Sequence, residues 1–330
     1  MTIDLEKIDR KALERLRTIF LQGSAGATDY WQTESDLENY DITFAQRIRW
    51  KWNDVLAGLA THNWQPPNGT LIDWGCGSGV ASRAFLERFG TDTVSDVLLW
   101  DRSVLAMQVA EKKVSAGFPG VPVRRYDGRS LEKSTVLISH VITELSPAQL
   151  AELLTIVQSA AAVLWVEPGA YEASRSLIEA RTRLRQDFNV VAPCTHQQGC
   201  GMLEAQNVRH WCHHFADSPQ EVFIDSAWAR FAKTMGIDLR QLPLSYLVLD
   251  KRPVPKFPSG AVRVIGDARL YKAHALLLGC DGAGVREHRL TKRILPEQFR
   301  RLKKGTGSSL QVWQCEGSEI VSSQELGSGS

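Results

Sequence analysis

A glycine-rich segment has the composition of a ligand-binding loop. It follows the apolar pair Leu71-Ile72, and its residues are Asp73, Trp74, Gly75, Cys76, Gly77, Ser78 and Gly79. Glycine permits a sharp turn and a close approach of the backbone to a ligand. A helix that begins after the loop would add free N–H groups and the positive end of its dipole. The G-x-G-x-G spacing after an acid differs from the dinucleotide pattern, so the kind of nucleotide stays open at this point.

Polar residues also end the next three apolar runs. The first run ends in Asp101-Arg102, the second in Asp127 and the third in Ser139-His140. The carboxyl ends of parallel strands meet at one edge of a sheet, where such folds bind ligands. A carboxylate at Asp101 can accept both hydroxyls of a ribose, and Asp127 is placed to meet an adenine edge. Together with the glycine loop, these residues predict one nucleoside site.

Three cysteines lie within a short polar segment that is rich in glycine, glutamine and histidine. Cys194, Cys200 and Cys212 follow C-x5-C-x11-C spacing, and Cys280 lies later, in an apolar run. A free cysteine is usually a small buried hydrophobe, which explains three in one polar segment poorly. Thiolates gathered in a reduced compartment indicate a metal.

Two kinds of metal centre compete for these thiolates. Zinc sites usually contain C-x2–4-C pairs, and the chain has none. An iron–sulfur cluster takes four thiolates and tolerates irregular spacing. Cys315 rivals Cys280 as the fourth ligand, and a histidine could replace one thiolate. The candidate histidines are His196, His210, His213 and His214.

Basic residues gather in one late segment of a nearly neutral chain. Between residues 286 and 304, eight basic residues face two acids, a local charge of +6. The basic residues are Arg286, Arg289, Lys292, Arg293, Arg300, Arg301, Lys303 and Lys304, and the acids are Glu287 and Glu297. A second basic run carries Arg175, Arg181, Arg183 and Arg185. Such patches hold phosphate-rich partners, so we expect RNA binding. Trp31, Trp50 and Trp52 are expected in the core, with base stacking as the alternative.

The composition frames these sites as parts of a globular protein. The chain has 330 residues, 43% hydrophobic and 23% charged, which predicts about two domains. The 39 Lys and Arg nearly balance the 37 Asp and Glu. The longest apolar run, Ala160–Val166, is far shorter than the ~20 residues of a membrane span. The N-terminal residues lack an apolar signal core and carry acids, so we expect a cytoplasmic protein without a membrane partner.

The pattern of apolar residues predicts an α/β fold. Short apolar runs alternate with amphipathic segments between residues 70 and 168, which is typical of a doubly wound parallel sheet with helices on both faces. Helical spacing at Leu5–Ile19 and after Asp41 predicts an N-terminal helical segment, with a polar loop over residues 22–41. From Leu244 onwards, strand-like runs predict a small β-rich element. The expected segments are 1–65 (helical), 66–190 (ligand-binding), 191–243 (Cys-rich, metal-binding), 244–322 (β-rich) and 323–330 (disordered tail).

Over roughly residues 45–170, the chain resembles class I S-adenosylmethionine-dependent methyltransferases. The resemblance implies that the Asp73–Gly79 loop holds the methionine part of the donor and that Asp101 holds the ribose. Methylation of exocyclic amines usually uses an N/D-P-P-Y/F turn after the fourth strand, whereas this chain has Ser139–Glu144 there. Only His140 and Glu144 remain as weak candidates for a catalytic base, so the catalytic residue stays unknown.

A second resemblance covers roughly residues 25–305. The strings Ala192–His196, Trp211–His213, Leu244–Leu249 and Glu167–Gly169 are similar to those of the methyltransferase-like assembly factors of the small ribosomal subunit in bacteria and mitochondria. The resemblance implies a [4Fe–4S] cluster on Cys194, Cys200, Cys212 and Cys280. The chain departs from the family where Thr195 and Gly201 replace usual prolines, and where a basic run is missing after Cys212.

Three hypotheses follow from these observations. In the first, a methyltransferase-like protein with a bound cluster acts on or with small-subunit rRNA, as a monomer away from the ribosome. In the second, an RNA-binding assembly factor holds the methyl donor without turnover. In the third, a zinc-containing methyltransferase acts on a small molecule or a protein. The target nucleotide is not predictable from these residues.

Overall fold

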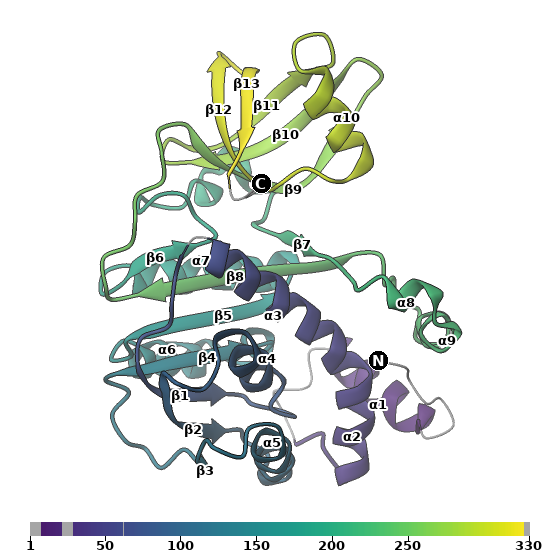
Figure 1. Cartoon of the computed structure of the whole chain (residues 1–330), viewed down its shortest axis with the longest axis vertical. Coiled ribbons are helices and arrows are strands. Elements are labelled where there is room, and N and C mark those ends of the chain that lie inside the picture. The colour runs from purple at the N-terminus through teal and green to yellow at the C-terminus, as the bar shows by residue number, and fades with distance from the viewer. Residues whose placement is uncertain (1–7, 22–28, 62, 327–330) are drawn as a thin grey trace. The chain divides into compact units, whose positions relative to one another are not determined.

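The computed structural model describes residues 8–21, 29–61 and 63–326, and it divides the chain into two compact units (Figure 1). Unit 1 comprises the residues up to Pro168 together with Phe215–Leu244. Unit 2 comprises Gly169–His214 and the residues from Ser245 onwards. The predicted segments 66–190 and 191–243 are thus each divided between the two units.

Both units contain helices and strands. The helices of unit 1 are α1 (Arg10–Leu21), α2 (Glu34–Ile42), α3 (Phe44–Thr61), α4 (Val80–Phe89), α5 (Val104–Gly117), α6 (Pro147–Val157), α8 (Glu221–Ile224) and α9 (Ser226–Met235). Its strands are β1 (Gly69–Trp74), β2 (Val94–Trp100), β3 (Val123–Arg125), β4 (Ser134–Ser139) and β5 (Ala162–Pro168). Unit 2 has α7 (Tyr171–Leu184), α10 (Pro296–Lys304), β6 (Asn189–Ala192), β9 (Ala261–Leu270), β10 (His274–Asp281), β11 (Gly284–Thr291), β12 (Leu310–Glu316) and β13 (Glu319–Glu325). Strands β7 (His214–Ala216) and β8 (Leu242–Asp250) cross the unit boundaries.

Unit 1 contains a parallel run of strands in the order β3-β2-β1-β4-β5. Helices α4, α5 and α6 follow β1, β2 and β4 along the chain, and such crossover connections are what parallel pairing requires. The central strands are buried on both faces, which explains their nearly continuous apolar sequence. This is the predicted doubly wound, Rossmann-like parallel sheet, and the prediction of the fold class is confirmed.

Local sequence explains where the helices beside this sheet begin. The Ser103 side chain caps α5, and Ser146 forms a capping box with Gln149 at the start of α6. A further capping box joins Thr33 and Asp36 at the start of α2. The prediction of a loop over residues 22–41 was therefore wrong for α2, while residues 22–28 lie outside the described part.

The N-terminal helices pack on the sheet's own helix α5. A buried cluster joins Leu16 of α1, Trp31 in the segment before α2, and Leu37 of α2 to Ala106 and Val109 of α5. Phe20, Tyr30 and Tyr40 are partly buried against the same cluster. Burial of this apolar area stabilises the docking of α1 and α2, so the N-terminal segment is an integral part of unit 1.

In unit 2, β6 pairs antiparallel with β8. Strand β8 contains the string Leu244–Leu249, which the sequence placed in the C-terminal β-rich element. That placement was wrong, because β8 bonds to β6 and has no place in the barrel that follows. A buried, continuous apolar strand does not reveal its partner, so periodicity alone could not choose between them.

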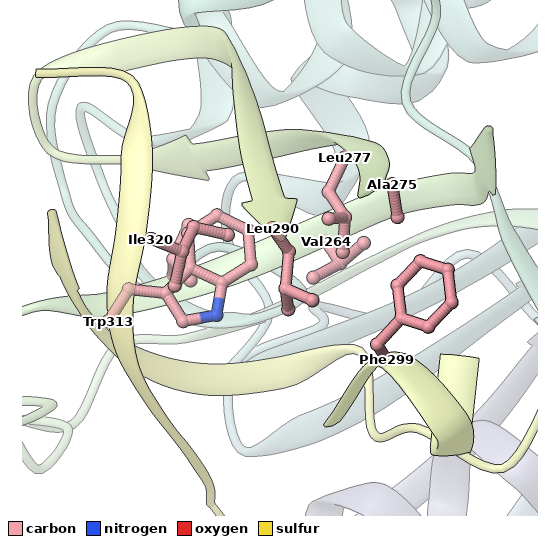
Figure 2. Close-up of a cluster of buried hydrophobic side chains, with 8 residues drawn as sticks. Val264, Ala275, Leu277, Leu290, Phe299, Trp313 and Ile320 are labelled. Atoms are coloured by element: carbon pink, nitrogen blue, oxygen red, sulfur yellow. The ribbon is translucent and has the colours of Figure 1, made fainter. Parts of the chain in front are cut away.

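Strands β9–β13 form a closed barrel, β10-β11-β13-β12-β9. Its interior holds Leu277, Leu290, Trp313 and Ile320, with Phe299 of α10 packed among them (Figure 2). The β-rich C-terminal element is confirmed. The predicted disordered tail was wrong for residues 323–325, because β13 extends to Glu325 and pairs with β12; residues 327–330 lie outside the described part.

None of the described helices has the length and hydropathy needed to span a membrane.

Candidate donor pocket and cysteine site

The loop after β1 needs its glycines for conformation and for space. Gly75, Gly77 and Gly79 have φ values of 75°, 49° and 75°, which side chains rarely adopt. A Cβ on Gly75 would lie 2.5 Å from Val141 Cγ2, whereas a Cβ on Gly77 would meet no atom within 4 Å. Gly75 therefore permits close packing against the turn after β4, and Gly77 borders open space.

Asp101 connects the end of β2 to this loop. Its Oδ2 accepts a hydrogen bond from the Gly77 N–H at 2.9 Å, and its Oδ1 accepts one from the Ser103 N–H at 2.9 Å. Burial raises the pKa of Asp101 above its usual value. A buried carboxylate that lines a cavity and fixes the glycine loop is well placed to meet hydroxyl donors of a ligand.

The other residues of the loop have structural contacts. Asp73 Oδ2 accepts hydrogen bonds from Ser82 N and Oγ, which ties β1 to α4, and burial raises the pKa of Asp73 to about 7. Trp74 stacks on Trp100 with 4.3 Å between ring centroids. Cys76 is buried, and this burial raises its thiol pKa. None of these three side chains lines the pocket described next.

A cavity of about 320 Å³ opens beside the loop within unit 1. The predicted residues Gly75, Gly77, Asp101, Arg102, Ser139, His140 and Glu144 line it. Its aromatic lining consists of Phe20, Tyr30, Trp31, Tyr40, Phe44 and Trp100. The cavity therefore joins the carboxyl edge of the sheet to rings contributed by the N-terminal helices.

His140 stands at the turn after β4 in a strained conformation. Its φ is +56°, it lines the cavity, and its buried Nε2 has no hydrogen-bond partner among the described residues. Burial, aided by nearby Lys51, lowers the pKa of His140 well below its usual value. Burial also lowers the pKa of Lys51 to about 7. At neutral pH, His140 is thus an uncharged ring with a free nitrogen.

Glu144 forms the second polar group of the cavity wall. Its Oε1 accepts a hydrogen bond from the Tyr30 hydroxyl at 3.3 Å, and its Oε2 lies 3.7 Å from an Arg102 guanidinium nitrogen. The same guanidinium sits 5.1 Å above the Tyr30 ring. Burial raises the pKa of Glu144 to about 7, against the opposing effect of Arg102.

Glu167 holds the turn that carries these groups. Its Oε1 accepts hydrogen bonds from the N–H groups of Val141 and Ile142 and from Trp165 Nε1. Since the side chain is fully buried, burial raises its pKa to about 7. Glu167 is therefore a positioning residue for the backbone of His140–Glu144.

Asp127 stands apart from the pocket. Its exposed carboxylate pairs with Arg129 at 2.7 Å, and this hydrogen bond lowers its pKa to about 2. It is not among the cavity-lining residues. The proposed adenine contact of Asp127 stays a prediction.

In unit 2, the four predicted cysteines come together although they span 86 positions from 194 to 280. Cys194, Cys200 and Cys212 line a small cavity of about 30 Å³. Cys280 belongs to a buried cluster that Cys200 and Cys212 pack against. Burial, followed by the neighbouring thiols, raises the pKa of Cys212. Among the described residues, no set of three or more His, Cys, Asp or Glu side chains is arranged to hold a metal ion.

The arginines of α7 surround this cysteine site. Arg175 donates hydrogen bonds to the carbonyls of Met202, Asn207 and His210, and Arg181 donates to Gln198. Arg181 is buried, lines the small cavity, and keeps two N–H groups without partners in the described part of the chain. The second basic run thus fixes the Cys-rich segment, and Arg175 and Arg181 do not form a free surface for RNA.

Cys315 is separate from the four-cysteine site. It is exposed on β12, and its Sγ lies 3.7 Å from His288 Nδ1. Cys280, in contrast, lies 3.7 Å from His196 Nε2, and Cys212 lies 3.7 Å from His214 Nε2. The structure therefore brings Cys280, and not Cys315, to the trio.

Comparison with known proteins gives one family. Residues 53–309 match the profile of the family described as mitochondrial small ribosomal subunit Rsm22. The chain belongs to the Rsm22 family. The matched region includes the glycine loop and all four cysteines of the unit 2 site. No curated protein matches the chain.

Two solved structures illustrate what else this Rsm22-family chain is similar to. Magnesium protoporphyrin IX methyltransferase from Synechocystis PCC 6803, solved with bound SAM, shares 11% identity over 74% of this chain and 98% of that one, with a TM-score of 0.40. A SAM-dependent methyltransferase from Leishmania major shares 14% identity over 73% of this chain and 82% of that one, with a TM-score of 0.38. Both likenesses concern the fold alone.

Sequence reasoning missed several groups in this Rsm22-family pocket. Tyr30, Tyr40 and Lys51 line the cavity, although nothing in their spacing distinguishes them from ordinary helix residues. Trp31 and Trp50 are buried, and Trp52 is buried and donates from Nε1 to Ser139 Oγ at 2.9 Å. The three tryptophans are therefore buried, as expected, and Trp31 also lines the cavity.

Proposed function

We propose that this protein binds S-adenosylmethionine in the unit 1 cavity, holds a [4Fe–4S] cluster in unit 2, and works with small-subunit rRNA in ribosome assembly. The main observation in favour of the donor site is the empty space beside Gly77, in a cavity that is also lined by Asp101 and by aromatic rings. Aromatic faces suit a cationic sulfonium. Membership of a family named for the mitochondrial small ribosomal subunit supports the ribosomal partner, and the cytoplasmic location remains a separate proposal.

Different residues of the cavity would contact different parts of the donor. S-adenosylmethionine, when bound, supplies a methyl group on a positively charged sulfur. Asp101 would hold hydroxyl groups of the ligand, and the glycine loop would hold its amino-acid end against the N-terminus of α4. Arg102 and Tyr30 position Glu144, and the free Nε2 of His140 can accept a proton from a nucleophile.

The unit 2 site fits an iron–sulfur cluster in its donor set. Three of the thiols line a small space, Cys280 packs near Cys200 and Cys212, and thiolates are the ligands of such clusters. Buried Arg181 lines the same cavity, and its Nε and Nη1 have no hydrogen-bond partner among the described residues, so they could donate to anionic sulfur atoms. Burial raises the pKa of Cys200, and Arg181 and Arg175 oppose part of this shift. Cys194, Cys200, Cys212 and Cys280 would hold the cluster.

A second candidate function is donor binding without methyl transfer. The turn after β4 is fixed by Glu167 through two backbone N–H groups, and it lacks the proline turn of amine methyltransferases. This observation favours a structural or sensory donor site. An assay of labelled methyl transfer to immature small subunits separates the two: label in rRNA supports the enzyme, and its absence, with donor bound, supports the assembly factor.

The donor site is tested by replacing Gly77 with valine. We expect loss of measurable S-adenosylmethionine binding in calorimetry, because the side chain would fill the open side of the loop. Gly305→Val is the matched control, since Gly305 has a φ of 67° and equally empty surroundings but lies outside the cavity. Both changes strain the backbone by roughly 1–2 kcal/mol. Normal donor affinity in Gly77→Val, or equal loss in both variants, contradicts the proposal.

A further inference from the structure

The barrel of unit 2 has a recognisable strand order. Counted from β9, its order is 1-2-3-5-4, closed between the fourth strand and the first. Strands β11 and β13 pair in parallel, and α10 lies between the third and fourth strands along the chain (Figure 1). This is the topology of the OB-fold, whose second and third strands and 1–2 and 4–5 loops form a ligand face. Because fold alone does not assign function, the side chains on that face decide.

The outer face of the barrel carries two arginines at the same register position, on the two strands that flank β10. Leu276 of β10 is in register with Arg269 of β9 and Arg289 of β11. Ala275 and Leu277, on either side of Leu276, point into the barrel core, so this register position faces outward. Arg269 and Arg289 are exposed. Arg269 pairs with Glu287, whereas Arg289 has no ion-pair partner among the described residues.

An aromatic stack stands next to this register position. The rings of Tyr271, in the β9–β10 loop, and His274, at the start of β10, lie 4.7 Å apart with only 10° between their planes. Tyr271 is 48% exposed, and Leu270 beside it is 45% exposed. Solvent-exposed aromatic rings of this kind offer the surface on which unpaired bases stack.

Both loops of the OB-fold face meet β11. The Lys292 N–H donates to the Ala273 carbonyl in the β9–β10 loop, and the Arg289 N–H donates to the Ser318 carbonyl in the β12–β13 loop. Exposed Lys272, Lys292 and Arg293 therefore gather near the aromatic stack. Glu287 and Glu319 border the patch, which leaves it basic overall.

We infer that this face binds single-stranded RNA, with one base stacked on Tyr271 and the backbone held by Arg289 and Lys292. A stacking ring beside free cations suits unpaired nucleotides, while a duplex hides its base faces. The inference rests on the proposed ribosomal partner and adds where and in which form its RNA is bound. The inference assigns RNA binding to only part of the basic run at 286–304. In α10, Arg300 pairs with Glu297 and Arg301 pairs with Glu325, so these two charges already have partners.

The test measures binding of the full-length protein to a fluorescein-labelled, mixed-sequence RNA of about twelve nucleotides, within the range of an OB-fold site. We expect Tyr271→Ala to weaken binding about tenfold and Tyr271→Phe to retain it, because the ring provides the stacking surface. Arg289→Ala should reduce the salt dependence of binding by about 0.7 in slope, the value for one contact to a single strand. Duplex RNA of the same sequence should bind more weakly.

Two controls make the outcome decisive. Phe223→Ala removes an aromatic side chain of similar exposure (54%) from α8 and should leave RNA binding unchanged. Polyglutamate serves as a competitor without bases, and equal competition by it would mean that the patch attracts any polyanion, which overturns the inference. Unchanged affinity in Tyr271→Ala, or preference for duplex, also overturns it. S-adenosylmethionine affinity, measured on the same variants, should not change, so a failure here is distinguishable from a failure of the donor site.

Discussion

The two candidate sites of this chain differ in how they are assembled. In unit 1, the donor loop is one contiguous segment, and its conformation depends on the φ values of Gly75, Gly77 and Gly79. In unit 2, the four thiols come from a long loop and from β10, and tertiary packing alone brings Cys280 to the others. A local backbone requirement is visible in a sequence, whereas convergence of distant segments is visible only in a structure.

The two sites also differ in how burial shifts the pKa values of their ionisable groups. In unit 1, burial shifts Glu144 and Lys51 to pKa values of about 7, so the cavity can lose much of its charge near neutral pH. In unit 2, burial raises the thiol pKa values of Cys280 and Cys212, and Arg181 and Arg263, respectively, oppose this shift. A donor cavity can function with neutral groups, while thiols must be deprotonated to bind a metal. For the proposed cluster, the arginines of unit 2 would favour the thiolate form that burial opposes.

The largest expected effect follows removal of one thiol. Cys212→Ser, prepared anaerobically, should lose its iron and its visible absorbance, because a four-thiolate site would lack one ligand. Binding energy of a structural metal centre is folding energy, so we expect the melting temperature of unit 2 to fall by more than about 10 °C. Iron analysis and a thermal melt followed by absorbance and circular dichroism measure both.

Cys315→Ser is the matched control for this change, since Cys315 pairs with His288 away from the other four. It should retain iron and melt like the unsubstituted protein. Iron retained in Cys212→Ser, or lost in Cys315→Ser, contradicts the assignment of the site. Stoichiometric zinc in a colourless protein would keep the thiolate site but replace the cluster.

The sequence predicted the doubly wound sheet, because alternating strands and helices leave a periodic trace between residues 70 and 168. It also predicted the glycine loop, whereas the residues alone left Cys280 and Cys315 as rival fourth ligands and only the family resemblance favoured Cys280. It could not predict the aromatic wall, because Tyr30 and Tyr40 have the spacing of ordinary core residues. It misplaced Leu244–Leu249, since a buried strand carries no mark of its partner. The arginines of α7 looked like an RNA surface because charge on a helix does not reveal which carbonyls it contacts.

A smaller effect tests the electrostatics of unit 1. The pKa of Glu144 is about 7 in the folded protein, against an ordinary 4.5. Between these values the folded protein holds a proton that the unfolded chain releases, so this group lowers stability as pH rises through the window. Glu144→Gln should therefore raise the free energy of unfolding at pH 8 by roughly 1–3 kcal/mol and leave it nearly unchanged at pH 4.

Urea denaturation at both pH values measures this difference. Glu152→Gln is the control, because Glu152 is exposed on α6 and its replacement should change neither value. A stability difference for Glu144→Gln that is equal at both pH values would show that the side chain acts through its contacts with Tyr30 and Arg102. The claim that the unit 1 cavity loses charge near neutral pH would then be wrong.

The smallest expected effect concerns the one cysteine of unit 1. Cys76 lies between two glycines of the loop, is 3% exposed, and does not line the cavity, although it stands inside the donor motif. Burial, with nearby Asp101 and Asp73, raises its thiol pKa, so the thiol stays protonated and unreactive. Cys76→Ala should therefore leave S-adenosylmethionine affinity unchanged and lower the free energy of unfolding by about 1 kcal/mol, through the loss of a small buried group.

Alkylation with iodoacetamide, measured by mass spectrometry, should modify exposed Cys315 first and Cys76 last. Early modification of Cys76, or a marked loss of donor affinity in Cys76→Ala, would mean that this thiol faces the ligand. The contrast between an unreactive thiol in unit 1 and the proposed ligand thiols of unit 2 would then be wrong.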